Sequence, residues 1–282
     1  MREIDQQASA ATSRGDRQQT ESLKRGLAIL RCFSPERSRL SNQDISAQTG
    51  LPKATVSRLA YTLTQLGYLV HSKETGLYRV GPPVLSLGFA CLSGIGVRDV
   101  AQPYMQNMAE YAGPGILVAL GARDDFSITY VGCSRSSGMI SLLLNVGSRV
   151  SLARSAIGRA YIAGLEENER ARVVSQLRER AGSNWPIIEE GILKSVAQVR
   201  ERGFCVNLGE WQPDVHSIAV PFSRVRPDEP LLAFNCGGPS YLLKPERLID
   251  DLGPRLVEMA QRVRMTLSET SYGTASGPLT TG

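Results

Sequence analysis

A group of short polar and basic side chains stands where a helix is predicted to begin. The group consists of Lys53, Ala54, Thr55, Ser57 and Arg58. Side chains of these types can reach the phosphates and base edges of DNA. The N-terminus of a helix also favours a phosphate. Residue type and spacing therefore predict contacts with DNA.

Two short helices joined by a tight turn are expected to position this group within residues 40–63. Ser41 can cap the first helix, and Asp44 follows at capping-box spacing. Gly50 suits the end of that helix, and Pro52 suits the first turn of the next. Apolar side chains of the second helix recur on one face, at Val56, Leu59, Leu63 and Leu66. The pattern predicts a helix-turn-helix whose second helix enters the major groove; a plain helical hairpin is the alternative.

Two short strands are predicted after the helix-turn-helix, at residues 67–70 and 77–80, around a turn at 72–76. They would form a two-stranded wing, with Lys73 at its tip and Arg79 on its second strand, both able to meet the DNA backbone. The complete set of predicted DNA-binding residues is Ser41, Lys53, Ala54, Thr55, Ser57, Arg58, Lys73 and Arg79.

A helix over residues 22–33 precedes these elements, and its predicted apolar stripe is Leu23, Leu27, Leu30 and Phe33. Positive charge is concentrated in the same part of the chain. Residues 1–81 hold 12 Lys and Arg against 7 Asp and Glu, whereas residues 82–282 hold 20 of each. The whole net charge of +5 thus lies with the helix-turn-helix, as binding to a polyanion would favour.

Five scattered cysteines and two histidines provide no paired ligand motif, so neither a metal nor another cofactor is expected. Reduced, buried thiols in a cytoplasmic protein are the expected state. The first 20 residues lack the apolar core of a signal peptide, and no apolar run reaches 18 residues. No membrane association is expected.

The rest of the chain alternates strands with helices, which predicts an α/β or α+β domain with one sheet and helices on its faces. Strands are expected at residues 116–120, 127–131, 139–144, 203–206, 216–221 and 231–235. Helices are expected at residues 100–111, 156–163, 166–180, 187–202 and 245–267. An apolar helix over 82–98 would link this domain to the wing.

The order and spacing of several segments resemble the IclR type of transcriptional regulator. In the first half they are residues 22–30, 45–59, 66–69 and 75–81. In the second half they are residues 147–152, 155–160, 202–204, 218–221 and 235–239. The resemblance implies a winged helix-turn-helix over 21–81, a linker helix over 82–98 and a GAF-like effector-binding domain over 99–270. Residues 1–20 and 271–282 are expected to be disordered tails.

The resemblance also implies partners and an effector site. The partners would be a dyad-symmetric double-stranded operator, a small organic or aromatic acid, and further copies of the chain in a homodimer or a dimer of dimers. Such proteins control catabolic genes. Carried over by position, the effector-binding residues are Met139, Leu142, Ala156, Ile157, Asn207, Ser217, Asn235 and Gly237.

Four of these positions depart from the family pattern. Asn207 stands where an acidic residue is common, Ser217 where a cysteine is common, and Asn235 and Gly237 where serines are common. Backbone N–H groups at the helix start near Ala156 would suit a carboxylate. The pocket would stay polar. The sequence leaves open which acid binds there and whether the protein represses or activates transcription.

Three other functions were weighed against this hypothesis. Asp214, His216 and Ser217 have the residue types of a hydrolytic triad, but neighbours on a strand point to opposite faces, so no catalytic residues are expected. A DNA-binding architectural protein would leave the neutral second domain unexplained. A GAF-like sensor that acts through a protein partner is the remaining alternative.

Overall fold

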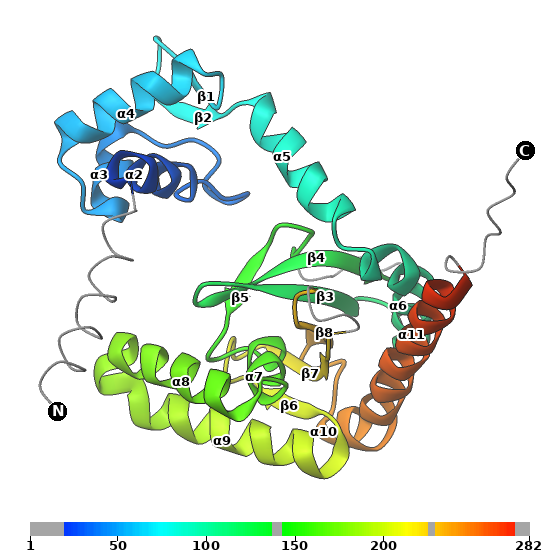
Figure 1. The fold of residues 1–282 in the computed structure, drawn as a ribbon. Coiled ribbons are helices and arrows are strands. Elements are labelled where there is room, and N and C mark those ends of the chain that lie inside the picture. The colour runs from blue at the N-terminus through cyan, green and yellow to red at the C-terminus, as the bar shows by residue number, and fades with distance from the viewer. Residues whose placement is uncertain (1–19, 137–142, 225–228, 274–282) are drawn as a thin grey trace, which may run out of the picture. The chain divides into compact units, whose positions relative to one another are not determined.

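The computed structural model describes residues 20–136, 143–224 and 229–273, shown in Figure 1. Its contacts divide the chain into two compact units, with the division between Cys91 and Leu92. The first unit contains the helix-turn-helix, and the second contains a mixed α and β domain, as the sequence predicts.

The described part of the first unit is built from four helices and a small sheet. Its elements are α2 (Glu21–Leu30), α3 (Asn42–Thr49), α4 (Lys53–Gln65), β1 (Leu69–His71), β2 (Tyr78–Val80) and α5 (Pro82–Ser93). The core consists of Ile29, Leu40, Ile45, Val56, Ala60 and Leu69, each at most 2% exposed. This small core fixes α4 against the other two helices of the motif.

The turn between α3 and α4 forms as predicted. Ser41 caps α3 in a capping box with Asp44, and Gly50 ends the helix in the left-handed region at φ 70°. Pro52 precedes α4, which begins at Lys53. Because glycine has no Cβ, this conformation costs Gly50 little, and the chain can turn tightly into α4.

The apolar stripe predicted on the first helix is wrong in part. Ile29 is the side chain of α2 that is fully buried, whereas Leu23 and Leu27 are 62% and 52% exposed. The helix also ends at Leu30, before Phe33. A helix of ten residues turns only one narrow face to so small a core, and that face is centred on Ile29.

The linker predicted as one helix over 82–98 is two pieces. Helix α5 ends at Ser93, and α6 (Val97–Ala112) begins the second unit, where Val97 is buried in the core. Gly94 and Gly96 lie in the break, and glycine lowers helix stability by about 1 kcal/mol relative to alanine. The break thus falls where helix propensity is lowest.

The second unit is organised around a six-stranded sheet formed by described residues. The strands are β3 (Leu117–Asp124), β4 (Ser127–Arg135), β5 (Arg149–Ser151), β6 (Cys205–Leu208), β7 (Val215–Phe222) and β8 (Leu232–Pro239). Their order is β5-β4-β3-β8-β7-β6, and all neighbours are antiparallel. Successive side chains of β3 enter two different cores: Val118 and Leu120 on one face, Leu117 and Ala119 on the other.

Helices cover both faces of this sheet (Figure 1). The core that contains Val118 also includes residues of α6 and of α11 (Gly253–Gly273). The core that contains Leu117 includes residues of α7 (Ala156–Ala163), α8 (Glu167–Ala181) and α9 (Trp185–Arg202). A short 3-10 turn at Gly182–Asn184 separates α8 from α9.

Three predicted elements of this unit need correction or fall outside the description. Of the strand predicted at 139–144, Leu143 and Leu144 have no regular structure, and the other four residues lie outside the described ranges. The three-residue strand β5 was not predicted, since it is too short to show alternation. The final helix is interrupted: α10 (Pro245–Arg247) passes through a π turn at Leu248–Leu252 before α11 begins.

Within the described ranges, no single helix combines the length and apolar composition that a membrane span requires. Helices α5 and α6 reach that length and apolar composition only when the two are counted together.

Candidate functional site

The start of α4 presents the group of residues that the sequence singled out. Lys53, Ala54, Ser57 and Arg58 are exposed, and Thr55 is half-buried. The first turn of α4 holds no acidic residue. An exposed, basic helix N-terminus of this kind favours a phosphate both through its free N–H groups and through its dipole.

Ser41, the cap of α3, and Asn42, its first residue, support the exposed surface at the start of α4. Ser41 is committed to the capping box: its Oγ lies 2.6 Å from Asp44 Oδ2, and its N–H donates to the same carboxylate at 2.8 Å. Asn42, which sequence reasoning missed, donates from Nδ2 to Ser57 Oγ at 2.7 Å. The Asn42 side chain therefore holds the Ser57 hydroxyl in place. Its position directly after the cap residue Ser41 is the sequence feature from which this contact could have been predicted.

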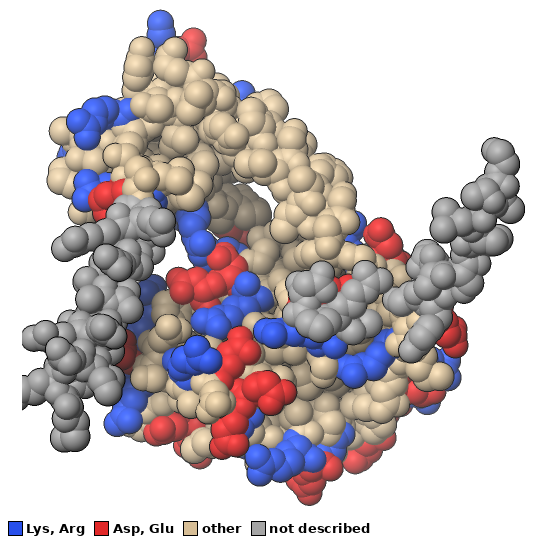
Figure 2. Space-filling view, viewed as in Figure 1, with Lys and Arg blue, Asp and Glu red and all other residues tan. Residues whose placement is uncertain are grey.

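The wing carries the other predicted contacts with DNA. Lys73 lies in the exposed turn between β1 and β2, and Arg79 is exposed on β2. In Figure 2 the visible face of the first unit is mostly uncharged, and the charged residues on it are mainly Lys and Arg, while positive and negative residues are intermixed on the second unit. This distribution agrees with the charge asymmetry of the sequence, and it fits a polyanion at the first unit.

A small cavity lies in the second unit at the start of α7. It unites five predicted effector residues, Ala156, Ile157, Ser217, Asn235 and Gly237, from three separate elements. The other lining residues are Tyr130, Leu144, Val150, Ser155, Trp211 and Val215. The cavity has about 280 Å³ of space between its atoms, little of it open to water. Only about 10 Å³ of it would admit a water-sized molecule, far below the about 300 Å³ at which pockets for small ligands begin, so its lining must move apart to admit an effector.

The polar groups of the cavity include one unpaired acceptor. Asn235 is 6% exposed, and within the described residues its Oδ1 has no hydrogen-bond partner. Burial raises the pKa of the neighbouring Tyr130 and the Cys133 thiol raises it further, while the Asn235 amide opposes both. An unpaired buried amide oxygen costs about 1–3 kcal/mol, so a ligand that donates to it gains that energy.

Backbone donors lie at the start of α7. The Ser155 Oγ caps this helix by accepting from the Gly158 N–H at 3.2 Å. The N–H groups of Ala156 and Ile157, in the first turn, have no acceptors within an α-helix. The cavity therefore combines backbone donors for a carboxylate with an amide acceptor for a hydroxyl.

Asn207 does not line the cavity. Its Nδ2 donates to Arg154 O at 2.8 Å, and its Oδ1 accepts from the N–H groups of Glu210 and Trp211 at 3.1 and 3.3 Å. Both the nitrogen and the oxygen of this amide are hydrogen-bonded to the backbone, so Asn207 shapes the wall that carries Trp211. Met139 and Leu142 lie outside the described residues.

The residues with triad chemistry are directed away from one another. His216 pairs with Gly238 and Ser217 with Gly237 along β7 and β8, so their side chains lie on opposite faces. His216 Nδ1 lies 2.8 Å from Leu243 O, while Ser217 lines the cavity. This arrangement provides no base for the serine hydroxyl.

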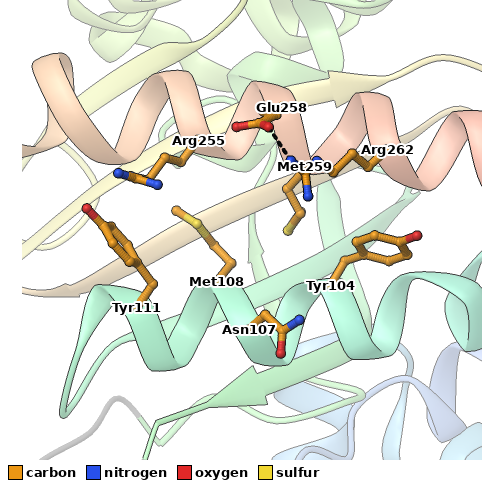
Figure 3. Close-up of a pocket in the computed structure, with 8 residues that line it drawn as sticks. All are labelled: Tyr104, Asn107, Met108, Tyr111, Arg255, Glu258, Met259 and Arg262. Atoms are coloured by element: carbon orange, nitrogen blue, oxygen red, sulfur yellow. Dashed lines mark hydrogen bonds and ion pairs between the residues drawn. The ribbon is translucent and has the colours of Figure 1, made fainter.

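A second concavity lies between α6 and α11, on the opposite side of the sheet (Figure 3). Tyr111 faces Arg255 there, with the guanidinium 3.9 Å from the ring centroid. Arg255 pairs with Asp251 at 2.8 Å, and Arg262 pairs with Glu258 at 2.6 Å. Both arginines are thus already paired with carboxylates of α11 and its π turn. Among the lining residues, neither arginine is left without a counter-charge to bind an acid.

Comparison with known proteins gives matches over most of the chain. Residues 22–72 match the model of the IclR helix-turn-helix domain, and residues 89–265 match the model described as bacterial transcriptional regulator IclR C-terminal. The HTH-type transcriptional regulator TsaQ1/TsaQ2 of Comamonas testosteroni is 31% identical over 245 residues, covering 86% of this chain and 87% of that protein.

Two further proteins are similar. The Pca regulon regulatory protein of Pseudomonas putida is 31% identical over 209 residues, which cover 73% of this chain and 70% of that protein. The crystal structure of an IclR family transcriptional regulator from Brucella abortus superposes with a TM-score of 0.80 at 43% identity. That match covers 90% of this chain and 94% of the other.

Proposed function

Because this chain belongs to the IclR family of bacterial transcriptional regulators, we propose that it is an effector-responsive regulator of catabolic genes. In this proposal the first unit binds a dyad-symmetric operator in the cytoplasm. The second unit senses a small organic acid, with hydroxylated aromatic acids as the favoured class. One relative is named as the regulator of a regulon, which supports this assignment.

The observation that carries the effector proposal is the unpaired Asn235 Oδ1 beside the start of α7. A carboxylate at the N–H groups of Ala156 and Ile157 and a hydroxyl at Asn235 would satisfy both sets of polar atoms. The apolar lining from Leu144, Val150 and Trp211 suits a ring between them. The effector must bind the DNA-competent and DNA-incompetent states with different affinities, since otherwise it shifts nothing.

A dyad-symmetric operator requires at least two copies of the chain, because one recognition helix reads only a few base pairs. Exposed apolar side chains of the first unit support an assembly, a homodimer or a dimer of dimers. They are Leu23 and Leu27 on α2 and Leu85, Leu87 and Phe89 on α5, all more than half exposed. Large exposed apolar side chains on two helices supply the kind of surface that a contact between proteins buries.

Operator binding is tested by fluorescence anisotropy of the duplex upstream of the protein's own gene, with a scrambled duplex as competitor and at fixed salt. Arg58→Ala is expected to weaken operator binding by about 1–3 kcal/mol. Arg25→Ala is the matched control, because Arg25 is an exposed arginine paired with Glu21 on α2. Wild-type affinity in Arg58→Ala, or equal binding to the scrambled duplex, would contradict the assignment.

Effector binding is tested with a panel of aliphatic and aromatic acids. Trp211 lines the cavity and Trp185 does not, so Trp185→Phe leaves one tryptophan that reports on the site. A hydroxylated acid is expected to change Trp211 emission and operator affinity together, and Asn235→Ala is expected to weaken both effects. An architectural protein would bind DNA without responding to any acid. A sensor for a protein partner would respond to an acid without selecting the operator.

A further inference from the structure

The wing is the two-stranded sheet that the sequence predicts, and one further backbone pairing, an isolated bridge, joins its edge to the segment before α3. Leu40 exchanges both backbone hydrogen bonds with Tyr78, from N–H to C=O at 3.0 Å and in return at 2.8 Å. The residue before α3's cap is therefore held against the free edge of β2 by this one bridge. The residue before Leu40 is Arg39, which belongs to no motif in the sequence.

This pairing places two arginines opposite each other. With Leu40 opposite Tyr78 in antiparallel register, the next positions along the two strands are Arg39 and Arg79. In an antiparallel arrangement the position after a hydrogen-bonded pair is the one where side chains come closer together. Both arginines line one cavity, together with Ser72 and Thr75 of the wing turn.

The two charges are not compensated by the surrounding structure. Both side chains are exposed, and among the described residues neither guanidinium forms an ion pair. Like charges directly opposite each other on neighbouring strands are destabilising. A local rule broken without a compensating contact points to a functional role.

The wing turn adds two hydroxyl groups to the same cavity. Ser72 Oγ accepts from the Thr75 N–H at 3.3 Å, and Thr75 Oγ1 accepts from the Leu77 N–H at 3.4 Å. Each hydroxyl keeps its own proton to donate outward. Two guanidinium groups and two hydroxyl donors match the oxygens of a phosphate, which arginine binds in a bidentate manner.

We propose that Arg39 and Arg79, with the Ser72 and Thr75 hydroxyls, form a clamp for one phosphate of the DNA backbone. The assignment of this phosphate to DNA rests on the proposed function, in which the first unit binds an operator. A phosphate contact fixes the position of the wing and carries no sequence information. A bound phosphate also offsets the repulsion between the two arginines. The repulsion therefore raises the free energy of the unbound protein, and DNA binding removes this contribution.

The first test measures DNA affinity and its salt dependence for full-length Arg39→Ala, Arg79→Ala and the double variant, with Arg25→Ala as the control. Loss of either clamp arginine is expected to weaken operator and scrambled duplex alike, by about tenfold, and to reduce the salt slope by about one. Thermal unfolding of the free protein separates this role from a structural one. Relief of the repulsion should leave the melting temperature of Arg39→Ala unchanged or raised.

The second test uses inorganic phosphate and does not depend on the operator. Phosphate should raise the melting temperature of the wild type above that in chloride at equal ionic strength, and Arg39→Ala should abolish the difference. A lowered melting temperature in Arg39→Ala, or unchanged affinity and salt slope together with no stabilisation of the wild type by phosphate, would overturn the clamp. Phosphate stabilisation without any loss of DNA affinity would make it a site for free phosphate and overturn the DNA assignment. A wild type that fails to select its operator would count against the proposed function. The melting temperatures in phosphate would still show whether Arg39 and Arg79 bind a phosphate.

Discussion

The guanidinium of Arg159 and the carboxylate of Glu210 form an ion pair in which the arginine side chain is 3% exposed and the glutamate 34%. Arg159 Nε also donates to Ala153 O at 2.9 Å. Glu210 lies in the turn that carries Trp211, and Ala153 lies just before α7. The pair therefore ties together two walls of the cavity at the start of α7.

Glu210→Gln keeps the shape of the side chain and leaves the buried guanidinium without a counter-charge. We expect it to lower the free energy of unfolding by about 1–3 kcal/mol, less than for a fully buried pair because Glu210 is a third exposed. Urea unfolding measures the change. The control is Glu258→Gln, whose pair with Arg262 is more than half exposed on both sides; its cost should stay below about 0.5 kcal/mol. Equal losses in the two variants would show that burial of Arg159 does not matter.

Gly191→Ala tests the packing of the same arginine. A Cβ at Gly191 of α9 would stand 2.1 Å from a terminal nitrogen of Arg159, which its two partners hold in place. We expect a loss of about 1–3 kcal/mol, the usual cost of overpacking. Gly26→Ala is the control within a helix, because a Cβ there meets nothing within 4 Å. That change should stabilise the protein by about 0.5–1 kcal/mol, and the two variants should move the urea midpoint in opposite directions.

The capping box of α3 should make stability depend on pH. Hydrogen bonds from the Ser41 hydroxyl and then from the Ser41 backbone lower the pKa of Asp44. A lowered pKa in the folded state stabilises the protein above the ordinary pKa of the carboxyl, and this contribution is lost as pH falls through the lowered value. Asp44→Asn should therefore lower the melting temperature at neutral pH, and the difference from the wild type should disappear in acid. A difference that does not depend on pH would assign the effect to shape and not to charge.

The buried thiols should resist modification while the protein is folded. Burial raises the pKa of Cys205 and of Cys236 to about 12 each. The thiolate is the reactive form, so iodoacetamide at pH 8 should leave both unmodified in the native protein and modify both in urea. Mass spectrometry of peptides measures the extent at each cysteine. Rapid native modification of Cys236 would show that the sheet opens locally, since that residue lies fully buried on β8.

Local patterns in the sequence were sufficient for much of the first unit. The capping box at Ser41, the left-handed Gly50 and the start of α4 at Lys53 each follow from side-chain chemistry within a few residues. Apolar periodicity also predicted most helices and strands of the second unit. The exposed leucines of α2 were mispredicted, because periodicity shows that a helix has an apolar face and not how much of it the core can cover.

The sequence by itself determined the family, the order of the elements and five residues that line one cavity of the second unit, since these depend on residue type and spacing. Only the tertiary structure revealed the buried Tyr130, the backbone hydrogen bonds that direct Asn207 away from the cavity, the ion pair of Arg159 and the Leu40–Tyr78 bridge that brings Arg39 beside Arg79. Each of these joins residues that are far apart in the chain. Such pairings are chosen by the register of strands and by competition for buried hydrogen bonds, and no local pattern encodes either.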